Sequence, residues 1–473
     1  MTRRHLRPAR RRFAIVAPLV AALVGCFGSS DPDVSAPGEV RYAFVLLGPD
    51  GQVVARAITA AATCPAIAID GGRPAPMALR AAAATLPARP TAYDKDNTVP
   101  AAFPVTVCDA PLPAGAVRAF IGTRALPMPK PHPRKILLIG DTGCRMKAAG
   151  DTSQYQACND PQQWPFAAIA RAAAAQAPDA VIHVGDYHYR ETACPPGNAG
   201  CAGSPYGFSW SSWEPDFFAP GAPLLAAAPW ILLRGDHETC DRGGQGWWRL
   251  LDPRPMQSLQ DCNDAANDGI GNYSDPYAVP LGDDTLFVVF DSAVVGNDKL
   301  KPSDAQFQRY RAQLEQAFAL GAGRPHAFFM NHQPILGYNS DGKPKAQPGN
   351  VALQSVLDAI VPTVLFPPNV QAVLSGHVHM MQIVSFATAQ PPIFIPGNGG
   401  TELVADFTEF PPDNTPVPDA VVAGLLHTAS FGFMVMERAA SGWTITAFDR
   451  TGRPQTTCTL FARKASCTPL TVS

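Results

Sequence analysis

The sequence Ala180-Val-Ile-His-Val-Gly-Asp-Tyr-His-Tyr189 joins an apolar run to a cluster of polar residues. Its apolar, β-branched start is typical of a buried strand, which then breaks at Gly185. Because open α/β sheets bind ligands at the carboxyl ends of their strands, Asp186 is predicted to lie at a ligand-binding edge. The two oxygens of Asp186 could reach two different cations, and Tyr189 could offer a phenolate.

Four other apolar runs in the chain also end in Asp or His. A single Gly-Asp would indicate only a turn. Its recurrence at the ends of five runs predicts that these side chains lie along one edge of one sheet. The other runs begin at Lys135, Trp230, Ala327 and Val370, and they end at Asp141, at Asp236 with His237, at His332, and at His377 with His379.

The composition describes a globular chain with a large core. The 473 residues allow roughly two or three domains. Apolar residues make up 46% of the chain and charged residues 16%, with a net charge of −2. Since basic patches and runs of like charge are missing from the sequence, we expect no nucleic-acid partner.

The first 26 residues have the pattern of an export signal. Arginines are followed by an apolar run, Phe13 to Val24, that is too short to cross a bilayer as a helix. Leu23-Val-Gly-Cys26 resembles a bacterial lipobox, in which the cysteine carries the lipid. We therefore expect an exported protein, periplasmic or at the cell surface, whose membrane contact is a lipid anchor at Cys26 followed by a tether over 27–37.

The cysteine count supports export. Of 11 cysteines, ten remain if Cys26 carries lipid, which allows five disulfides and suits an oxidising compartment. A cysteine-ligated metal is disfavoured because the sequence contains no C-x-x-C spacing. The sequence leaves the connectivity open, and the simplest hypothesis pairs neighbours: Cys64 with Cys108, Cys144 with Cys158, Cys194 with Cys201, Cys240 with Cys262, and Cys458 with Cys467.

Short strands, a linker and an α/β region follow one another along the chain. Residues 38–126 predict a small β-sandwich-like domain, and 127–133 a stiff Pro-rich linker. From there to residue 473 strands and helices alternate, which predicts a sheet covered by helices on both faces. Later strands, after residue 382, predict a second sheet packed on the first. Helices are expected at 165–177, at 350–360, and after a capping box at Ser303-Asp-Ala-Gln306.

In order, the short motifs resemble the pattern of the calcineurin-like metallophosphoesterases, and within them the purple acid phosphatases. The resemblance covers roughly residues 134–450. It implies an α/β fold, a β-sandwich flanked by helices in four layers (α/β/β/α), beside the N-terminal β-rich domain. The motifs are Gly140-Asp141-Thr-Gly143, Gly185-Asp186-Tyr-His-Tyr189, Gly235-Asp236-His237-Glu238, His332 and Gly376-His377-Val-His379.

The resemblance also implies a two-metal centre, with Fe(III) and a divalent Zn, Mn or Fe ion. Such a pair clamps a phosphate and lowers the pKa of a bound water, so that hydroxide can attack in line. His237 would then protonate the leaving oxygen or contact phosphate. Asp186 would bridge the ions, with Asp141, Tyr189 and His379 completing the first site and Asp236, His332 and His377 the second.

One motif departs from the family pattern, which has Asn where this chain has Asp236. The extra negative charge could tighten a divalent ion or repel phosphate. The leading hypothesis is a hydrolase of phosphate monoesters resembling acid phosphatases. The alternatives are a phosphodiesterase on the same core, or a surface lipoprotein that binds metal or ligand with little turnover.

Other polar and aromatic residues near the motifs have open assignments. His183 is predicted to be core, and His188 either contacts substrate or lies in a solvated loop. Two long loops, Glu191–Trp213 and Cys240–Tyr277, are expected to be functional or clamped. Their tryptophans could line the bottom of a substrate pocket or fill the core: Trp210, Trp213, Trp247 and Trp248.

Overall fold

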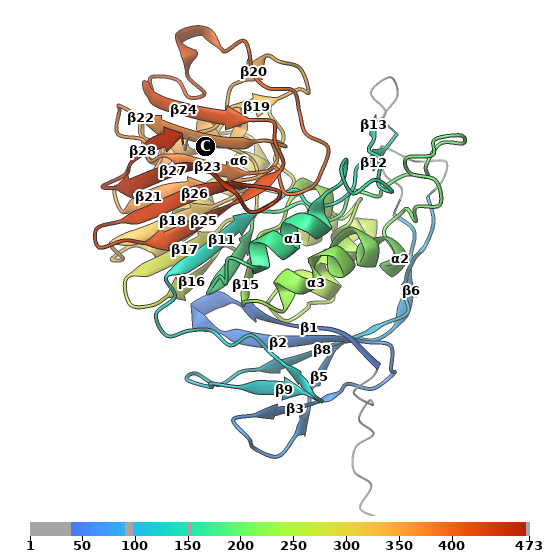
Figure 1. Ribbon diagram of the computed structural model, residues 1–473. Coiled ribbons are helices and arrows are strands. Elements are labelled where there is room, and N and C mark those ends of the chain that lie inside the picture. The colour runs from blue at the N-terminus through green and yellow to red at the C-terminus, as the bar shows by residue number, and fades with distance from the viewer. Residues whose placement is uncertain (1–38, 90–97, 149–153, 470–473) are drawn as a thin grey trace, which may run out of the picture. The chain divides into compact units, whose positions relative to one another are not determined.

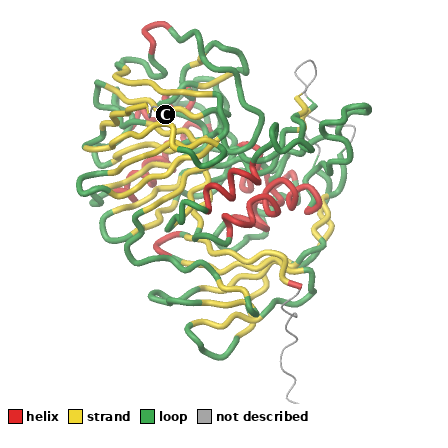
Figure 2. Tube along the Cα trace, in the orientation of Figure 1, coloured by secondary structure: helices red, strands yellow, loops and turns green. Residues whose placement is uncertain are grey.

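The computed structural model describes residues 39–89, 98–148 and 154–469 (Figure 1). The export signal, Cys26 and the tether over 27–37 lie outside the described residues. Among the residues that are described, every helix is too short or too polar to cross a membrane. Strands and loops dominate this mixed α/β chain and helices are fewer (Figure 2).

The first sheet has 11 strands, in the order β28-β27-β26-β25-β11-β14-β15-β1-β2-β8-β5. At its centre β11, β14 and β15 run parallel, with Ile136 beside Ala180 and Val181 beside Trp230. Their apolar residues are buried on both faces, as parallel strands require. The bounds are β11 Lys135–Ile139, β14 Ala180–His183, β15 Trp230–Leu232, β25 Gly432–Arg438, β26 Trp443–Asp449, β27 Pro454–Phe461 and β28 Lys464–Pro469.

The N-terminal region continues this sheet. Strand β1 pairs in parallel with β15, through Leu46 and Trp230, and β2, β8 and β5 follow. A smaller sheet, β10-β9-β3-β4, shares an apolar core with them. The separate domain over 38–126 stays a prediction, but its larger sheet is continuous with that of the motif region. The bounds are β1 Val40–Leu47, β2 Val53–Thr59, β3 Ala66–Ile69, β4 Ala75–Pro76, β5 Ala78–Ala81, β8 Thr106–Pro111, β9 Ala119–Ile121 and β10 Arg124–Ala125.

The second sheet has seven strands, in the order β16-β17-β18-β21-β23-β22-β24. The prediction of one sheet for all five runs is therefore wrong, because β18 and β21, which precede the histidine motifs, belong here. The late strands also divide, since β22 to β24 lie here while β25 to β28 return to the first sheet. The bounds are β16 Tyr277–Leu281, β17 Thr285–Val289, β18 His326–Met330, β21 Val370–Leu374, β22 Met381–Phe386, β23 Ile393–Pro396 and β24 Val422–Thr428.

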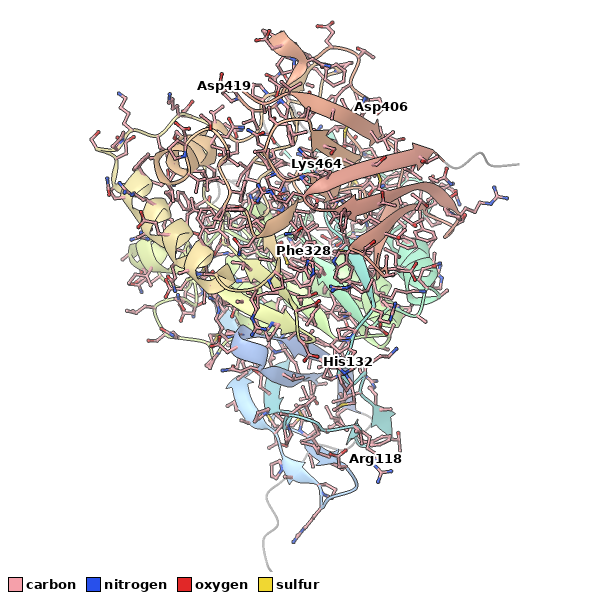
Figure 3. The ribbon with its side chains drawn as sticks, turned by 90° about the vertical axis from the view of Figure 1, so that its left-hand side faces the viewer. Arg118, His132, Phe328, Asp406, Asp419 and Lys464 are labelled. Carbon is pink, nitrogen blue, oxygen red and sulfur yellow. A yellow bond between two sulfur atoms is a disulfide. The ribbon has the colours of Figure 1, made fainter. Side chains whose placement is uncertain are left out.

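Apolar side chains from both sheets form one core. Phe328 of β18 is labelled in Figure 3. Its ring meets Trp443 of β26 edge-to-face, with ring centroids 5.6 Å apart, and stacks on Phe287 with centroids 5.0 Å apart. Another core packs helices α1 (Phe166–Ala174) and α3 (Ala219–Leu225) on the first sheet. A third packs α6 (Ala305–Gly321) and α7 (Val351–Ile360) on the second. The four-layer order as such stays a prediction.

The helix ends test the capping predictions. Helix α7 begins after Asn350, whose side chain accepts a hydrogen bond from Leu353 N at 2.9 Å. The capping box predicted for α6 is wrong, because the N-cap is Asp304 and its carboxylate accepts a hydrogen bond from Lys301 N instead.

Short elements make up the rest of the described secondary structure: η2 Pro49–Gly51, β6 Ala84–Leu86, β7 Ala101–Phe103, β12 Met146–Lys147, β13 Gln154–Tyr155, α2 Trp210–Trp213, η4 Glu214–Phe218, η5 Asp236–Glu238, α4 Gly244–Gly246, η6 Trp247–Leu251, η7 Ala265–Asn267, α5 Asp268–Gly271, β19 Asn339–Ser340, β20 Ala346–Gln347 and η8 Pro412–Asn414.

Five disulfides confirm the consecutive pairing. Three of them clamp loops that leave strands of the first sheet: Cys144–Cys158 after β11, Cys194–Cys201 after β14 and Cys240–Cys262 after β15. The number of disulfides suggests an exported protein, since disulfides persist in oxidising compartments. The other two among the described residues are Cys64–Cys108 and Cys458–Cys467.

Candidate metal centre

The ends of β11, β14 and β15 face the ends of β18 and β21 across the two sheets, and the motif side chains meet there. Ligand atoms of the first group, Asp141, Asp186 and His379, lie within 4.8 Å of one another. The same limit holds for the second group, which comprises Asp186, Asp236, His332 and His377. Asp186 belongs to both groups, as a bridging carboxylate would.

Short contacts connect the second group. His332 Nε2 lies 3.2 Å from both Asp186 Oδ2 and Asp236 Oδ1, and His377 Nδ1 lies 3.0 Å from Asp236 Oδ1. His332 is oriented by its other nitrogen, since Nδ1 donates to Val184 O at 2.8 Å. That bond leaves the Nε2 lone pair facing the carboxylates, the arrangement in which histidine binds a metal.

The side chain of Tyr189 lies beside the first group. Its hydroxyl lies 2.6 Å from Asp186 Oδ2, 2.9 Å from His379 Nε2 and 3.2 Å from Asp141 Oδ1. His379 Nδ1 donates to Glu402 O at 2.8 Å, which again directs Nε2 inward. Two carboxylates, a phenol and one imidazole nitrogen thus lie close together.

Three motif residues have a strained backbone conformation. Asp141, Asp186 and His377 have φ values of 54°, 62° and 71°, in the left-handed region that residues with a Cβ rarely adopt. Gly235 explains why Asp186 can approach, because a Cβ at Gly235 would lie 2.0 Å from Asp186 Oδ1. The close approach therefore depends on glycine.

Glu238 fixes the two neighbouring turns. Its buried carboxylate accepts hydrogen bonds from the backbone N–H groups of Asp186, Tyr187 and Gly235 at 2.8 to 3.1 Å. Burial and the nearby Asp186 raise the pKa of Glu238 to about 8. Glu238 therefore holds the turn that carries Asp186 against the turn that carries Asp236.

The charges of this cluster suit cations. Burial, with Asp186 and Asp236 close by, raises the pKa of Asp141 well above its ordinary value. Burial also opposes ionisation of Asp186, yet the neighbouring His332 and His237 keep its pKa below the usual value. Two buried carboxylates, Asp141 and Asp186, and the partly buried Asp236 lie within a few ångströms and need compensating positive charge, and mixed oxygen and imidazole donors suit Zn, Mn or Fe. The residues present therefore fit two metal ions.

His237 lies beside the ligands without joining either group. Its ring packs on Tyr189 with centroids 3.7 Å apart, and its Nε2 lies 3.9 Å from Asp186 Oδ2. Nδ1 lies 3.0 Å from Glu191 Oε1 and 2.6 Å from Arg242 Nη2. Burial and the positive Arg242 lower the pKa of His237 well below its ordinary value.

A cavity of about 310 Å³ opens onto the cluster. Asp186, Asp236 and His237 line its inner wall. Arg145 and Lys147 add positive charge to the lining, with Arg145 Nη1 3.3 Å from His379 Nδ1. Burial and the nearby Arg242 lower the pKa of Lys147 to about 8. The remaining lining residues are Gln154, Ser340, Asp341, Gly342, His377, His379 and Val404.

Comparison with known families decides the assignment. Residues 134–381 match the family model described as calcineurin-like phosphoesterase. The chain belongs to this family. Family membership implies hydrolase activity, and members typically bind metals.

Solved structures resemble this chain only distantly. GAP50, titled the anchor in the inner membrane complex of Plasmodium, is 12% identical with a TM-score of 0.40, over 70% of this chain and 89% of GAP50. A conserved uncharacterized protein and predicted phosphoesterase from Streptococcus pneumoniae is 10% identical with a TM-score of 0.23, over 71% of this chain and 98% of that one. A search of curated proteins gave no match.

Several residues near the motifs lie outside this phosphoesterase site. His183 is buried, as predicted, with Nε2 3.1 Å from Thr142 Oγ1. Both alternatives for His188 are wrong, because it is fully buried with Nε2 3.0 Å from Ser212 Oγ. Of the two alternatives for the tryptophans, core filling is right, since all four lie in the core under the loops: Trp210, Trp213, Trp247 and Trp248.

Sequence reasoning missed four charged residues of the site. Glu191 begins one of the long loops and Arg242 lies in the other, so loop length was the available signal. Arg145 and Lys147 follow the first motif directly, in Gly143-Cys-Arg-Met-Lys147. Charged residues so close to a ligand motif were the signal there.

Proposed function

We propose that this chain hydrolyses phosphate monoesters at a two-metal centre of the purple acid phosphatase kind. The observation that carries the proposal is the Tyr189 hydroxyl, which lies within 3.2 Å of Asp141, Asp186 and His379. A phenolate in that position favours Fe(III). Asp141, Asp186, Tyr189 and His379 would hold that ion, and Asp186, Asp236, His332 and His377 would hold a divalent Zn, Mn or Fe ion.

The protein's own groups would orient the substrate and move a proton. When bound, the metal ions supply Lewis acidity and lower the pKa of water. His237 lines the cavity beside the bridging Asp186, so its imidazole can donate to the leaving oxygen or to a phosphate oxygen. Glu191 and Arg242 contact the opposite nitrogen and hold the ring in place.

Two cationic side chains in the cavity lining support the proposal of monoesters over diesters. A phosphate monoester carries up to two negative charges at neutral pH, whereas a diester carries one. Arg145 and Lys147 both line the cavity, and cationic side chains bind the more highly charged ester more tightly. We therefore propose phosphate monoesters as the substrate class and phosphodiesters as the alternative.

We also propose export and lipid anchoring through Cys26. The five disulfides support an oxidising compartment. Labelling with a radioactive or alkyne-bearing fatty acid, in wild type and in Cys26→Ala, tests the anchor. Label in both proteins would contradict attachment at Cys26.

Paired aryl substrates test the reaction. We expect the metal-loaded protein to hydrolyse p-nitrophenyl phosphate with a kcat/KM at least about tenfold higher than for bis-p-nitrophenyl phosphate. A reversed preference would assign a phosphodiesterase. Activity on neither ester, with both metals present, would contradict the proposal.

A further inference from the structure

We infer that Arg242 is a charge-balancing positioning residue that offsets the extra negative charge of Asp236 toward metal and phosphate. The inference rests on the proposed two-metal site. It concerns the departure noted in the sequence, an acidic residue where the resembling motifs carry Asn. The structure supplies a basic partner for this acid.

The two oxygens of Asp236 have separate partners. Oδ1 faces the second group, 3.2 Å from His332 Nε2 and 3.0 Å from His377 Nδ1. Oδ2 accepts from Arg242 Nη1 at 2.7 Å, the length of a charge-assisted hydrogen bond. One oxygen is thus directed at the metal position, while the other is held by a guanidinium.

Arg242 is itself held in place. Its side chain is 5% exposed, and its Nε donates to Glu191 Oε1 at 2.6 Å. Nη1 also donates to the backbone carbonyl of Asp236 at 3.1 Å. The Cys240–Cys262 disulfide clamps the loop that carries it. The guanidinium is therefore preorganised to face Asp236.

The charges predict opposite effects of the two single substitutions. Arg242 is shared by the carboxylates of Glu191 and Asp236. Asp236→Asn removes one negative charge from this group of three, which should weaken the second divalent ion and strengthen phosphate binding. Arg242→Gln removes its one positive charge, which should keep or tighten the metal and weaken phosphate. The double variant restores the wild-type net charge and should return both affinities toward wild type. One uncompensated charge this close corresponds to about tenfold or more in each affinity.

Calorimetry on the full chain tests the inference. The metal-free protein is titrated with Zn(II), the loaded protein with inorganic phosphate, and bound metal is counted by elemental analysis. We expect the two single variants to shift each affinity in opposite directions by about tenfold, and the double variant to lie within about threefold of wild type. Shifts in the same direction, or a double variant no better than the worse single one, would overturn the inference.

Two further variants keep the test decisive. Arg56→Gln is the matched control, because Arg56 forms a buried ion pair with Asp109 (Nε to Oδ1 2.7 Å) in the N-terminal strands. It should lower the unfolding temperature and leave both affinities unchanged. If Arg242→Gln does not fold, Arg242→Lys retains the charge and should keep both affinities within a few-fold. A loss of phosphate affinity of about tenfold or more in Arg242→Lys would overturn the charge argument.

The outcome for wild type separates this inference from the proposed function. Fewer than two metals in wild type, even after refilling, would overturn the two-metal proposal and this inference with it. Two metals in wild type without the opposite shifts would overturn the charge balance alone.

Discussion

Replacing His237 separates its two candidate roles. Asparagine at this position can still donate a hydrogen bond to phosphate but cannot deliver a proton, whereas alanine can do neither. If His237 is the general acid, both variants should lose about 10²–10⁴-fold in kcat on an alkyl phosphate. This loss corresponds to about 3–5 kcal/mol of activation free energy.

The structure predicts that these variants stay folded and loaded. The ring packs on Tyr189 at 3.7 Å between centroids, which contributes about 0.5–1.5 kcal/mol. Glu191 and Asp236 keep their ion pairs with Arg242, at 2.6 and 2.7 Å, so neither carboxylate is left unpaired. Two metals per chain should therefore remain in both variants.

The assay compares an alkyl phosphate with p-nitrophenyl phosphate, whose weakly basic leaving group needs little protonation. An acid role predicts a large loss on the alkyl ester and a small loss on the aryl ester, equal for the two variants. Retention of activity by His237→Asn, with loss in His237→Ala, would assign a phosphate contact instead. A loss below about tenfold on the alkyl ester in both variants, with metals intact, would show that His237 has neither role.

Three further predictions follow from single contacts. Lys147→Met should raise KM for a monoester more than for a diester. The pKa of Lys147 is lowered to about 8, so the ammonium that binds phosphate is lost as pH rises through 8. The wild-type KM for the monoester should therefore rise in that pH range, and the KM of the variant should not. Gly235→Ala should remove stoichiometric metal in elemental analysis, since the new Cβ would lie 2.0 Å from Asp186 Oδ1, and full metal content would contradict the packing. Phe328→Ala should destabilise the chain by about 3–5 kcal/mol in denaturant unfolding, because the ring is fully buried between the sheets, and a cost below about 1 kcal/mol would contradict that core.

The motif side chains and their meeting point could be predicted from the sequence, because each follows an apolar run that must be a buried strand. The division of those strands between two sheets could not. Buried strands such as β14 and β18 have the same hydrophobic pattern, and periodicity does not say which neighbour a strand pairs with. The continuity of β1 with β15 was hidden for the same reason.

Local chemistry explains the remaining differences. The capping box failed because Asp304 bonds Lys301 N, a choice between neighbouring donors that the sequence leaves open. The Asp236–Arg242 pair joins two residues of one turn, yet sequence alone does not show that Arg242 folds back onto the ligand. Consecutive disulfide pairing succeeded because each pair closes a short segment of chain, up to the separation of 44 residues between Cys64 and Cys108.

Metal content and the visible absorption spectrum, measured on one purified sample, test the two-metal centre and the role of Tyr189 together. We expect about two metals per chain, including iron, and a broad visible charge-transfer band from tyrosinate to Fe(III). Tyr189→Phe should lose this band. A wild-type protein that binds no stoichiometric metal after refilling would contradict the two-metal centre, and a band unchanged in Tyr189→Phe would contradict the assignment of Tyr189 as a ligand.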